Sequence, residues 1–136
     1  MKISKLSGII FVLLASLGTT ELATADNHWS DEWTVEVDGK SKSRGTINFK
    51  ITFKPGSDVA AREAVTIDVL IANDTGENDI AMFISNSFRA VLGDEEFKID
   101  VDSGEEVEIE SRGDTPDFVL EVIASSIQGI SLELDN

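Results

Sequence analysis

The sequence predicts an α+β fold in which a curved antiparallel sheet of about seven strands packs on one amphipathic helix. Two observations favour this fold. Apolar and polar residues alternate along seven separate segments, which is the period of a strand with one buried face. Between the third and fourth segments, residues 77–92 repeat their apolar side chains at the spacing of a helix. The predicted order is therefore β-β-β-α-β-β-β-β.

The seven strand segments are bounded by turn signals that contain Gly, Pro, Asn or Asp. They are residues 33–38, 47–54, 65–71, 97–101, 107–110, 118–123 and 130–134. Nearly every one of them has one apolar face and one face of charged residues or Thr. This pattern is typical of an antiparallel sheet that is covered on one side.

The helical segment carries its own start and stop signals. Asp74 and Glu77 have the spacing of a capping box, and Gly93 predicts the C-terminal end. A helix over 77–92 is about 24 Å long and cannot cover seven flat strands spaced about 4.8 Å apart. We therefore expect the sheet to curl around the helix, with a split into two small sheets as the main alternative.

The first twenty-five residues have the pattern of an export signal. Lys2 and Lys5 precede a short apolar run at 8–17, and Ala23-Thr24-Ala25 is a small-residue cleavage pattern. The run is too short to span a bilayer. We predict a signal peptide at 1–25 and a single globular domain at 26–136, located in the periplasm or outside the cell. No membrane insertion is expected after cleavage.

Composition excludes several classes of function. The chain has no Cys, so disulfides, thiolate metal sites and catalytic thiols are excluded. Its net charge is −15, and loss of residues 1–25 changes this to −16. Such a charge repels nucleic acid and anionic membranes, so neither is an expected partner.

The basic residues are unevenly distributed along the chain. Residues 40–62 contain six of them and one acid, Asp58. This stretch predicts either a strand paired with acidic neighbours or a surface for an acidic partner or a second copy of the chain. Trp29 lies outside the strand pattern, and we expect it either to cap one end of the curled sheet or to stack on a sugar or peptide. The candidate binding surface is Trp29, Lys40, Lys42, Arg44, Lys50 and Lys54.

The predicted mature N-terminus has the pattern of a metal site. Cleavage after Ala25 leaves Asp26-Asn27-His28 at the start of the chain. The α-amine, two backbone amides and the imidazole of His28 can then form a square-planar site for Cu(II) or Ni(II). This motif resembles the amino-terminal copper and nickel site of unrelated secreted proteins. It predicts metal binding only if the mature chain begins at Asp26.

Acidic residues crowd two neighbouring strands and their turn. They are Asp100, Asp102, Glu105, Glu106, Glu108 and Glu110. Their spacing does not match a calcium loop, and we expect weak Ca²⁺ binding or a solvated edge that resists aggregation. Because the chain has so many acids, some pair of carboxylates will always have the separation that glycosidases use, so such a pair is no evidence of that activity. A Ser-His-Asp triad would need His28, the single His of the chain. We expect no enzymatic activity and no resident cofactor.

Three short motifs carry a resemblance. They are Gly45-Thr46-Ile47, Thr75-Gly76-Glu77-Asn78 and Thr115-Pro116-Asp117-Phe118. With them, residues 45–134 resemble small exported proteins of Gram-negative bacteria that have no assigned function, and more faintly the β-β-α-β-β inserts of flagellar and tail-tube proteins. The resemblance implies no catalytic or ligand residue.

These observations predict an exported, non-catalytic binding or interaction module whose partner is a protein or a glycan. A self-assembling surface or filament subunit is the first alternative. Binding of Cu(II) or Ni(II) through the mature N-terminus is the second.

Overall fold

The structure, a computed structural model, describes residues 10–14, 20–22, 28–56 and 62–136, and for the first two ranges it describes the backbone alone. The elements are nine strands and one helix in these ranges. They are β1 (Ile10–Leu14), β2 (Thr20–Leu22), β3 (Glu32–Gly39), β4 (Gly45–Phe53), β5 (Val65–Ile71), α1 (Glu77–Leu92), β6 (Phe97–Asp102), β7 (Glu106–Ser111), β8 (Phe118–Ser125) and β9 (Ile130–Asp135).

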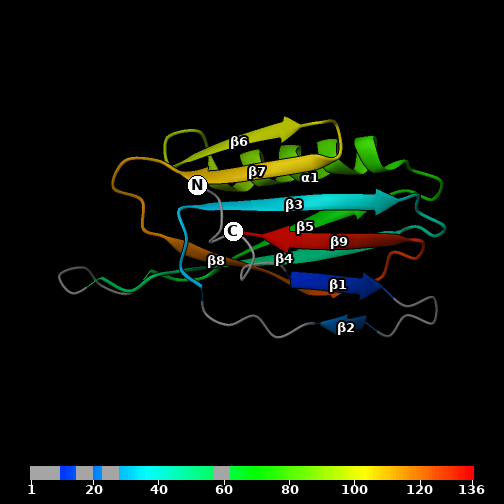
Figure 1. The fold of residues 1–136 in the computed structure, drawn as a ribbon, viewed down its shortest axis with the longest axis horizontal. Helices are drawn as coiled ribbons and strands as arrows, with labels where there is room; N and C mark the ends of the chain where they lie inside the picture. The colour runs from blue at the N-terminus through cyan, green and yellow to red at the C-terminus, as the bar shows by residue number, and fades with distance from the viewer. Residues whose placement is uncertain (1–9, 15–19, 23–27, 57–61) are drawn as a thin grey trace.

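The strands divide into two open antiparallel sheets (Figure 1). Sheet A has the order β2-β1-β9-β3-β7-β6, and sheet B has the order β5-β4-β8. The α+β class, the seven antiparallel strands after residue 28 and the single helix confirm the prediction. The prediction of one sheet wrapped around the helix was wrong, and the split into two sheets is what the structure shows.

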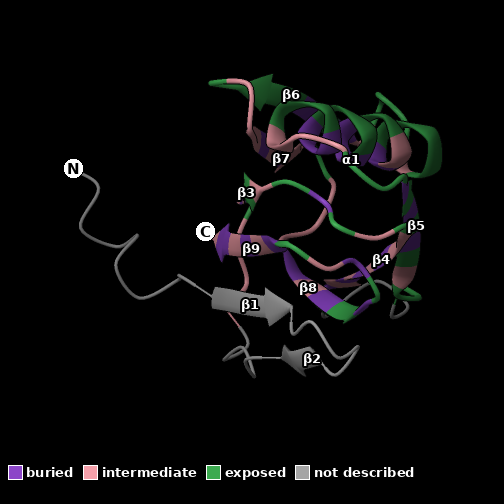
Figure 2. Cartoon of the chain, turned by 90° about the vertical axis from the view of Figure 1, so that its right-hand side faces the viewer, coloured by how far each residue is buried: buried purple, intermediate pink, exposed green. Residues whose placement is uncertain are grey.

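The arrangement of the layers accounts for the split (Figure 2). The helix α1 lies against β3, β6 and β7 of sheet A and beside β5 of sheet B. It is too short to cover the remainder of sheet A. Sheet B supplies a second apolar face instead, and the inward residues of both sheets and of α1 form one buried core.

Trp33 joins the two sheets inside this core. Its side chain is completely buried on β3, and its indole Nε1–H donates a hydrogen bond of 2.9 Å to the carbonyl oxygen of Phe118 on β8. Phe97 on β6 packs edge-to-face on Phe118 with 5.5 Å between ring centroids, and Phe49 on β4 packs in the same way on Phe88 of α1 at 5.0 Å. These contacts bury large aromatic areas and fix the spacing of the layers.

The predicted helix boundaries are confirmed, because α1 spans Glu77–Leu92 and ends at Gly93 with a φ of 78°. The predicted capping box was wrong. Gly76 is the N-cap residue and no side chain caps the helix. Asp74 has a φ of 65° and forms an ion pair with Lys40, while Glu77 accepts a hydrogen bond from the backbone N–H of Gly39. Contacts from distant parts of the chain therefore take both side chains away from the helix end.

Part of the predicted signal segment is built into sheet A. β1 pairs with β9, and the short β2 pairs with β1 (Figure 1). The alternation of apolar and polar residues predicts no strand in this segment. Within the described residues, no helix combines the length and the apolar character that a membrane span requires.

Candidate interaction surface

The outer face of sheet A is covered with carboxylates. Alternation along β3, β6, β7 and β9 places their apolar residues in the core and their polar residues outside. Ten outward positions on these four strands are acidic: Glu32, Glu36, Asp38, Asp100, Asp102, Glu106, Glu108, Glu110, Glu133 and Asp135. Lys98 is a basic residue on the same outer face, and its Nζ lies 3.6 Å from a carboxylate oxygen of Asp100. We call these ten residues the acidic face.

The strand register places many of these acids directly opposite one another. The like-charged pairs are Glu36–Glu106, Glu36–Glu133, Glu32–Glu110, Asp100–Glu108 and Asp102–Glu106. Side chains at opposite positions of an antiparallel pair lie close together, and like charges there destabilise the sheet. The acidic face therefore costs stability in the isolated protein, and a bound cationic group would remove that cost.

Two acids on β9 show this electrostatic strain. Partial burial raises the pKa of Glu133, and the neighbouring charges of Glu36 and Asp135 raise it further. The Oδ1 atom of Asp135 is buried and has no hydrogen-bond partner among the described residues. A buried carboxylate oxygen without a donor is unfavourable. The β9 side of the acidic face is therefore suited to a cationic hydrogen-bond donor.

Two further carboxyl groups lie close together beside the acidic face. Glu77 at the start of α1 and Glu105 in the β6–β7 turn form a side-chain hydrogen bond, which lowers the pKa of Glu77 and raises the pKa of Glu105. The hydrogen bond from Gly39 also lowers the pKa of Glu77, and the charges of Glu36 and Asp38 raise that of Glu105. Of the two carboxyl groups, Glu105 therefore keeps its proton to the higher pH.

The acidic cluster predicted on β6 and β7 forms one end of the acidic face. Carboxylate oxygens of Asp102, Glu106 and Glu108 lie within 4.8 Å of one another, so this group has the oxygen ligands that Ca²⁺ prefers. Sequence reasoning missed the contribution of β3 and β9. Alternation placed their acids on one side of each strand, but the strand order that brings these strands beside β7 was not predictable from spacing.

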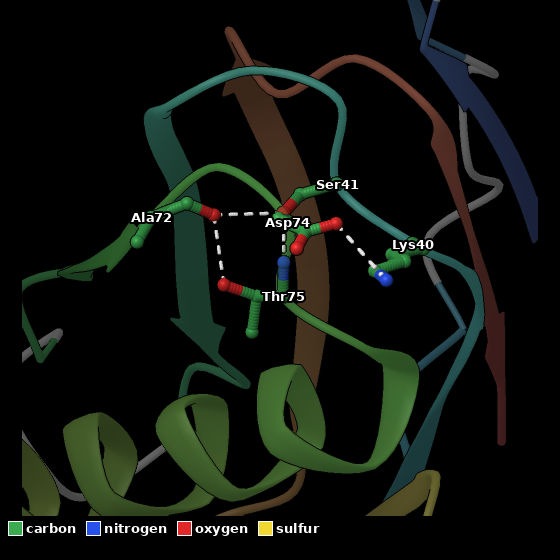
Figure 3. Close-up of polar contacts among 5 residues, drawn as sticks. All are labelled: Lys40, Ser41, Ala72, Asp74 and Thr75. Atoms are coloured by element: carbon green, nitrogen blue, oxygen red, sulfur yellow. Dashed lines mark hydrogen bonds and ion pairs between the residues drawn. The ribbon is translucent and has the colours of Figure 1, made fainter.

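The predicted basic surface is not gathered in one place. Lys40 forms an ion pair of 2.9 Å with Asp74 (Figure 3). Its neighbour Ser41 is buried, donates a hydrogen bond to the carbonyl oxygen of Ala72 and accepts one from the backbone N–H of Thr75. These bonds tie the β3–β4 connection to the segment before α1, so this stretch holds the fold together at one end.

The other four basic candidates lie apart. The backbone N–H of Lys42 bonds to the carbonyl oxygen of Gln128, and Arg44 lines a shallow cleft with Leu70 and Phe83. Lys50 lies opposite Glu121 on the outer face of sheet B. Lys54 follows the far end of β4 and lines a cleft of about 480 Å³. That cleft contains Arg62, Asp114 and Asp117 as well, so its charge is balanced.

The candidate copper residues are only partly covered by the structure. Asp26 and Asn27 lie outside the described residues. His28 is half-buried, and its carbonyl oxygen accepts a hydrogen bond from the side chain of Asn136. Trp29 is half-buried and packs against the core, so part of the ring is available for stacking.

Comparison with known proteins gives no relative: no protein-family model, no curated protein and no solved structure matches this chain.

Proposed function

We propose that this protein is an exported, non-catalytic interaction module that binds a basic partner through the acidic face. The observation that carries the proposal is the arrangement of ten carboxylates on four adjacent strands with like charges directly opposed. A cationic partner would neutralise this repulsion, and electrostatic attraction would accelerate its association. The pattern of residues 1–25 supports export to the periplasm or the exterior.

Titration calorimetry with a flexible peptide of eight lysines at physiological salt tests this proposal. The exported protein is the sample, and its matched variants are Glu36→Gln with Glu108→Gln on the acidic face, and Glu63→Gln with Glu95→Gln on exposed connections. Both variants lose two negative charges. We expect the first to weaken binding by about fivefold, as the loss of one or two exposed ion pairs would. Equal effects of the two variants, or no binding to the wild-type protein, would contradict the proposal.

The same surface suggests Ca²⁺ as a competing ligand at Asp102, Glu106 and Glu108. Extracellular modules bind Ca²⁺ with dissociation constants of about 10⁻⁴–10⁻³ M. We expect Ca²⁺ at concentrations in this range to weaken binding of the lysine peptide. Mg²⁺ is expected to weaken this binding less than Ca²⁺ because it keeps its hydration shell. Calorimetry with each ion alone measures both affinities.

Copper binding at the mature N-terminus is a second candidate function. It is favoured by the position of His28 three residues after the predicted cut. Mass spectrometry maps the N-terminus of the exported protein, and absorbance titration with Cu(II) counts the bound metal. One inserted residue before Asp26 moves the imidazole out of position and is expected to abolish one-to-one binding. A terminus other than Asp26 would remove the site.

A further inference from the structure

We propose that removal of residues 1–25 opens the edge of β9, and that this edge binds an extended strand of alternating apolar and basic residues. The inference rests on the proposed function, because it names how the basic partner would dock beside the acidic face. It adds a binding mode, in which the partner extends sheet A by one strand.

The structure itself shows that the edge of β9 accepts a strand. β1 pairs with it in antiparallel register, with Ile10 opposite Leu134 and Val12 opposite Leu132 (Figure 1). Leu132 and Leu134 are buried in the core. The edge therefore takes a strand whose residues opposite Leu132 and Leu134 are apolar.

Export would take this strand away. The predicted cut after Ala25 removes β1 and β2 together, while β3 continues to pair with β9 on the opposite side. The backbone N–H and C=O groups that β9 directs toward β1 would then lose their partners. An open edge of this kind is a template for another strand.

The charges around β9 select the chemistry of the partner. Glu133 and Asp135 alternate with the buried leucines, and Glu36 lies opposite Glu133 on β3. The buried Oδ1 atom of Asp135 lacks a donor among the described residues. A strand with basic residues opposite Glu133 and Asp135 would supply both charge and hydrogen bonds. Pairing of β9 with a second copy would instead bring two acidic faces together.

Hydrogen exchange of the exported protein tests the binding mode. The probe is the peptide Lys-Ile-Lys-Val-Lys-Leu, which places Ile and Val opposite Leu134 and Leu132 and lysines opposite Asp135, Glu133 and Ser131. Its controls are Glu-Ile-Glu-Val-Glu-Leu and Lys-Ile-Lys-Pro-Lys-Leu. The proline peptide has the same charge but lacks one backbone N–H and fits a ladder poorly. We expect the first peptide alone to slow exchange within residues 130–135.

Two charge-reversed variants separate edge pairing from general attraction. Glu133→Lys changes a residue beside the proposed strand, and Glu110→Lys makes the same change on β7, away from that edge. We expect Glu133→Lys to lower the affinity for the peptide Lys-Ile-Lys-Val-Lys-Leu by about two- to fivefold relative to Glu110→Lys. This factor corresponds to the free energy of one cross-strand charge pair. The full-length chain, in which β1 occupies the edge, is expected not to bind.

Several results would overturn the inference. Equal binding of the proline peptide without protection of residues 130–135 would mean that the acidic face attracts cations but that β9 accepts no strand. This result would leave the proposed function intact. Dimerisation that protects β9 in sedimentation and exchange experiments would identify a second copy as the occupant. An exported protein that still contains Ile10–Leu14 would remove the open edge.

Discussion

The outer faces of the two sheets differ in how their charges are placed. On sheet B, Lys50 lies opposite Glu121, and the side-chain amide of Asn48 donates a hydrogen bond to Asp68 on the neighbouring strand. On sheet A, acids lie opposite acids in five register pairs, and Lys98 opposite Glu110 is an oppositely charged pair. The inner faces of both sheets are equally apolar. The difference indicates that stability accounts for the outer face of sheet B, whereas sheet A carries a charge pattern that stability alone does not explain.

Sheets A and B share one core. The substitution with the largest expected effect on stability tests whether Trp33 joins them. Trp33→Ala removes a completely buried side chain and its hydrogen bond to Phe118, which joins the two sheets. We expect a loss of about 3–5 kcal/mol in the free energy of unfolding, measured by urea denaturation. Trp29→Ala removes a half-buried indole and is expected to lose less. Equal losses would show that Trp33 does not join the sheets.

Matched neutralisations on the two outer faces test the comparison itself. Glu36→Gln relieves repulsion from Glu106 and Glu133, so we expect it to stabilise the protein. Lys50→Gln removes attraction to Glu121 and is expected to destabilise it. Each change corresponds to roughly 0.2–1 kcal/mol per cross-strand pair, and urea denaturation at low and high salt measures it. Stability changes of the same sign in the two variants would remove the distinction between the sheets. Added salt is expected to reduce the size of both stability changes because it screens exposed charges.

The opposite pKa shifts of Glu77 and Glu105 give a smaller, pH-dependent effect. The raised pKa of Glu105 means that the folded state keeps a proton which the unfolded chain releases, so stability falls as pH rises above the ordinary value of 4.5. The lowered pKa of Glu77 means that stability also falls as pH drops below 4.5. Partial burial and acidic neighbours raise the pKa of Glu133. Ionisation of Glu133 therefore adds to the loss of stability as pH rises.

Replacement of Glu105 by Gln separates this pair from the remaining acids. The amide of Glu105→Gln donates a hydrogen bond to Glu77 at every pH, so we expect the variant to be more stable than the wild type at neutral pH. The advantage should disappear near pH 4.5, where the wild-type carboxyl group is protonated. Glu95→Gln removes the same charge from an exposed turn and provides the control. A gain in the thermal unfolding temperature that does not depend on pH would contradict the raised pKa of Glu105.

Local patterns in the sequence predicted most of the elements. Two-residue alternation located six of the seven strands after residue 28, a more fully apolar run located β8, and helical spacing located Glu77–Leu92. These predictions succeed because alternation and helical spacing both report which side of an element is buried. The division into two sheets depends on pairing between distant strands, such as β3 with β9, and no local pattern encodes it.

The errors near α1 and in the basic region have the same origin. The spacing of Asp74 and Glu77 is local, but Lys40 and Gly39 reach these side chains from the end of β3. The basic residues are neighbours in sequence, yet β4 carries Lys54 to the opposite end from Lys40 and Lys42. The acidic residues of β6 and β7 were grouped correctly because a tight hairpin joins their strands. The contributions of Glu36 and Glu133 required the order of strands in sheet A.

Mapping of a bound cation by nuclear magnetic resonance tests the central claim most directly. The ¹⁵N-labelled protein without residues 1–25 is titrated with the eight-lysine peptide at physiological salt, and amide shifts are followed residue by residue. The account predicts that the largest shifts fall on β3, β6, β7 and β9, with β4, β5 and β8 little changed. Shifts concentrated on sheet B, or the absence of any saturable change, would contradict the assignment of the acidic face as the interaction surface.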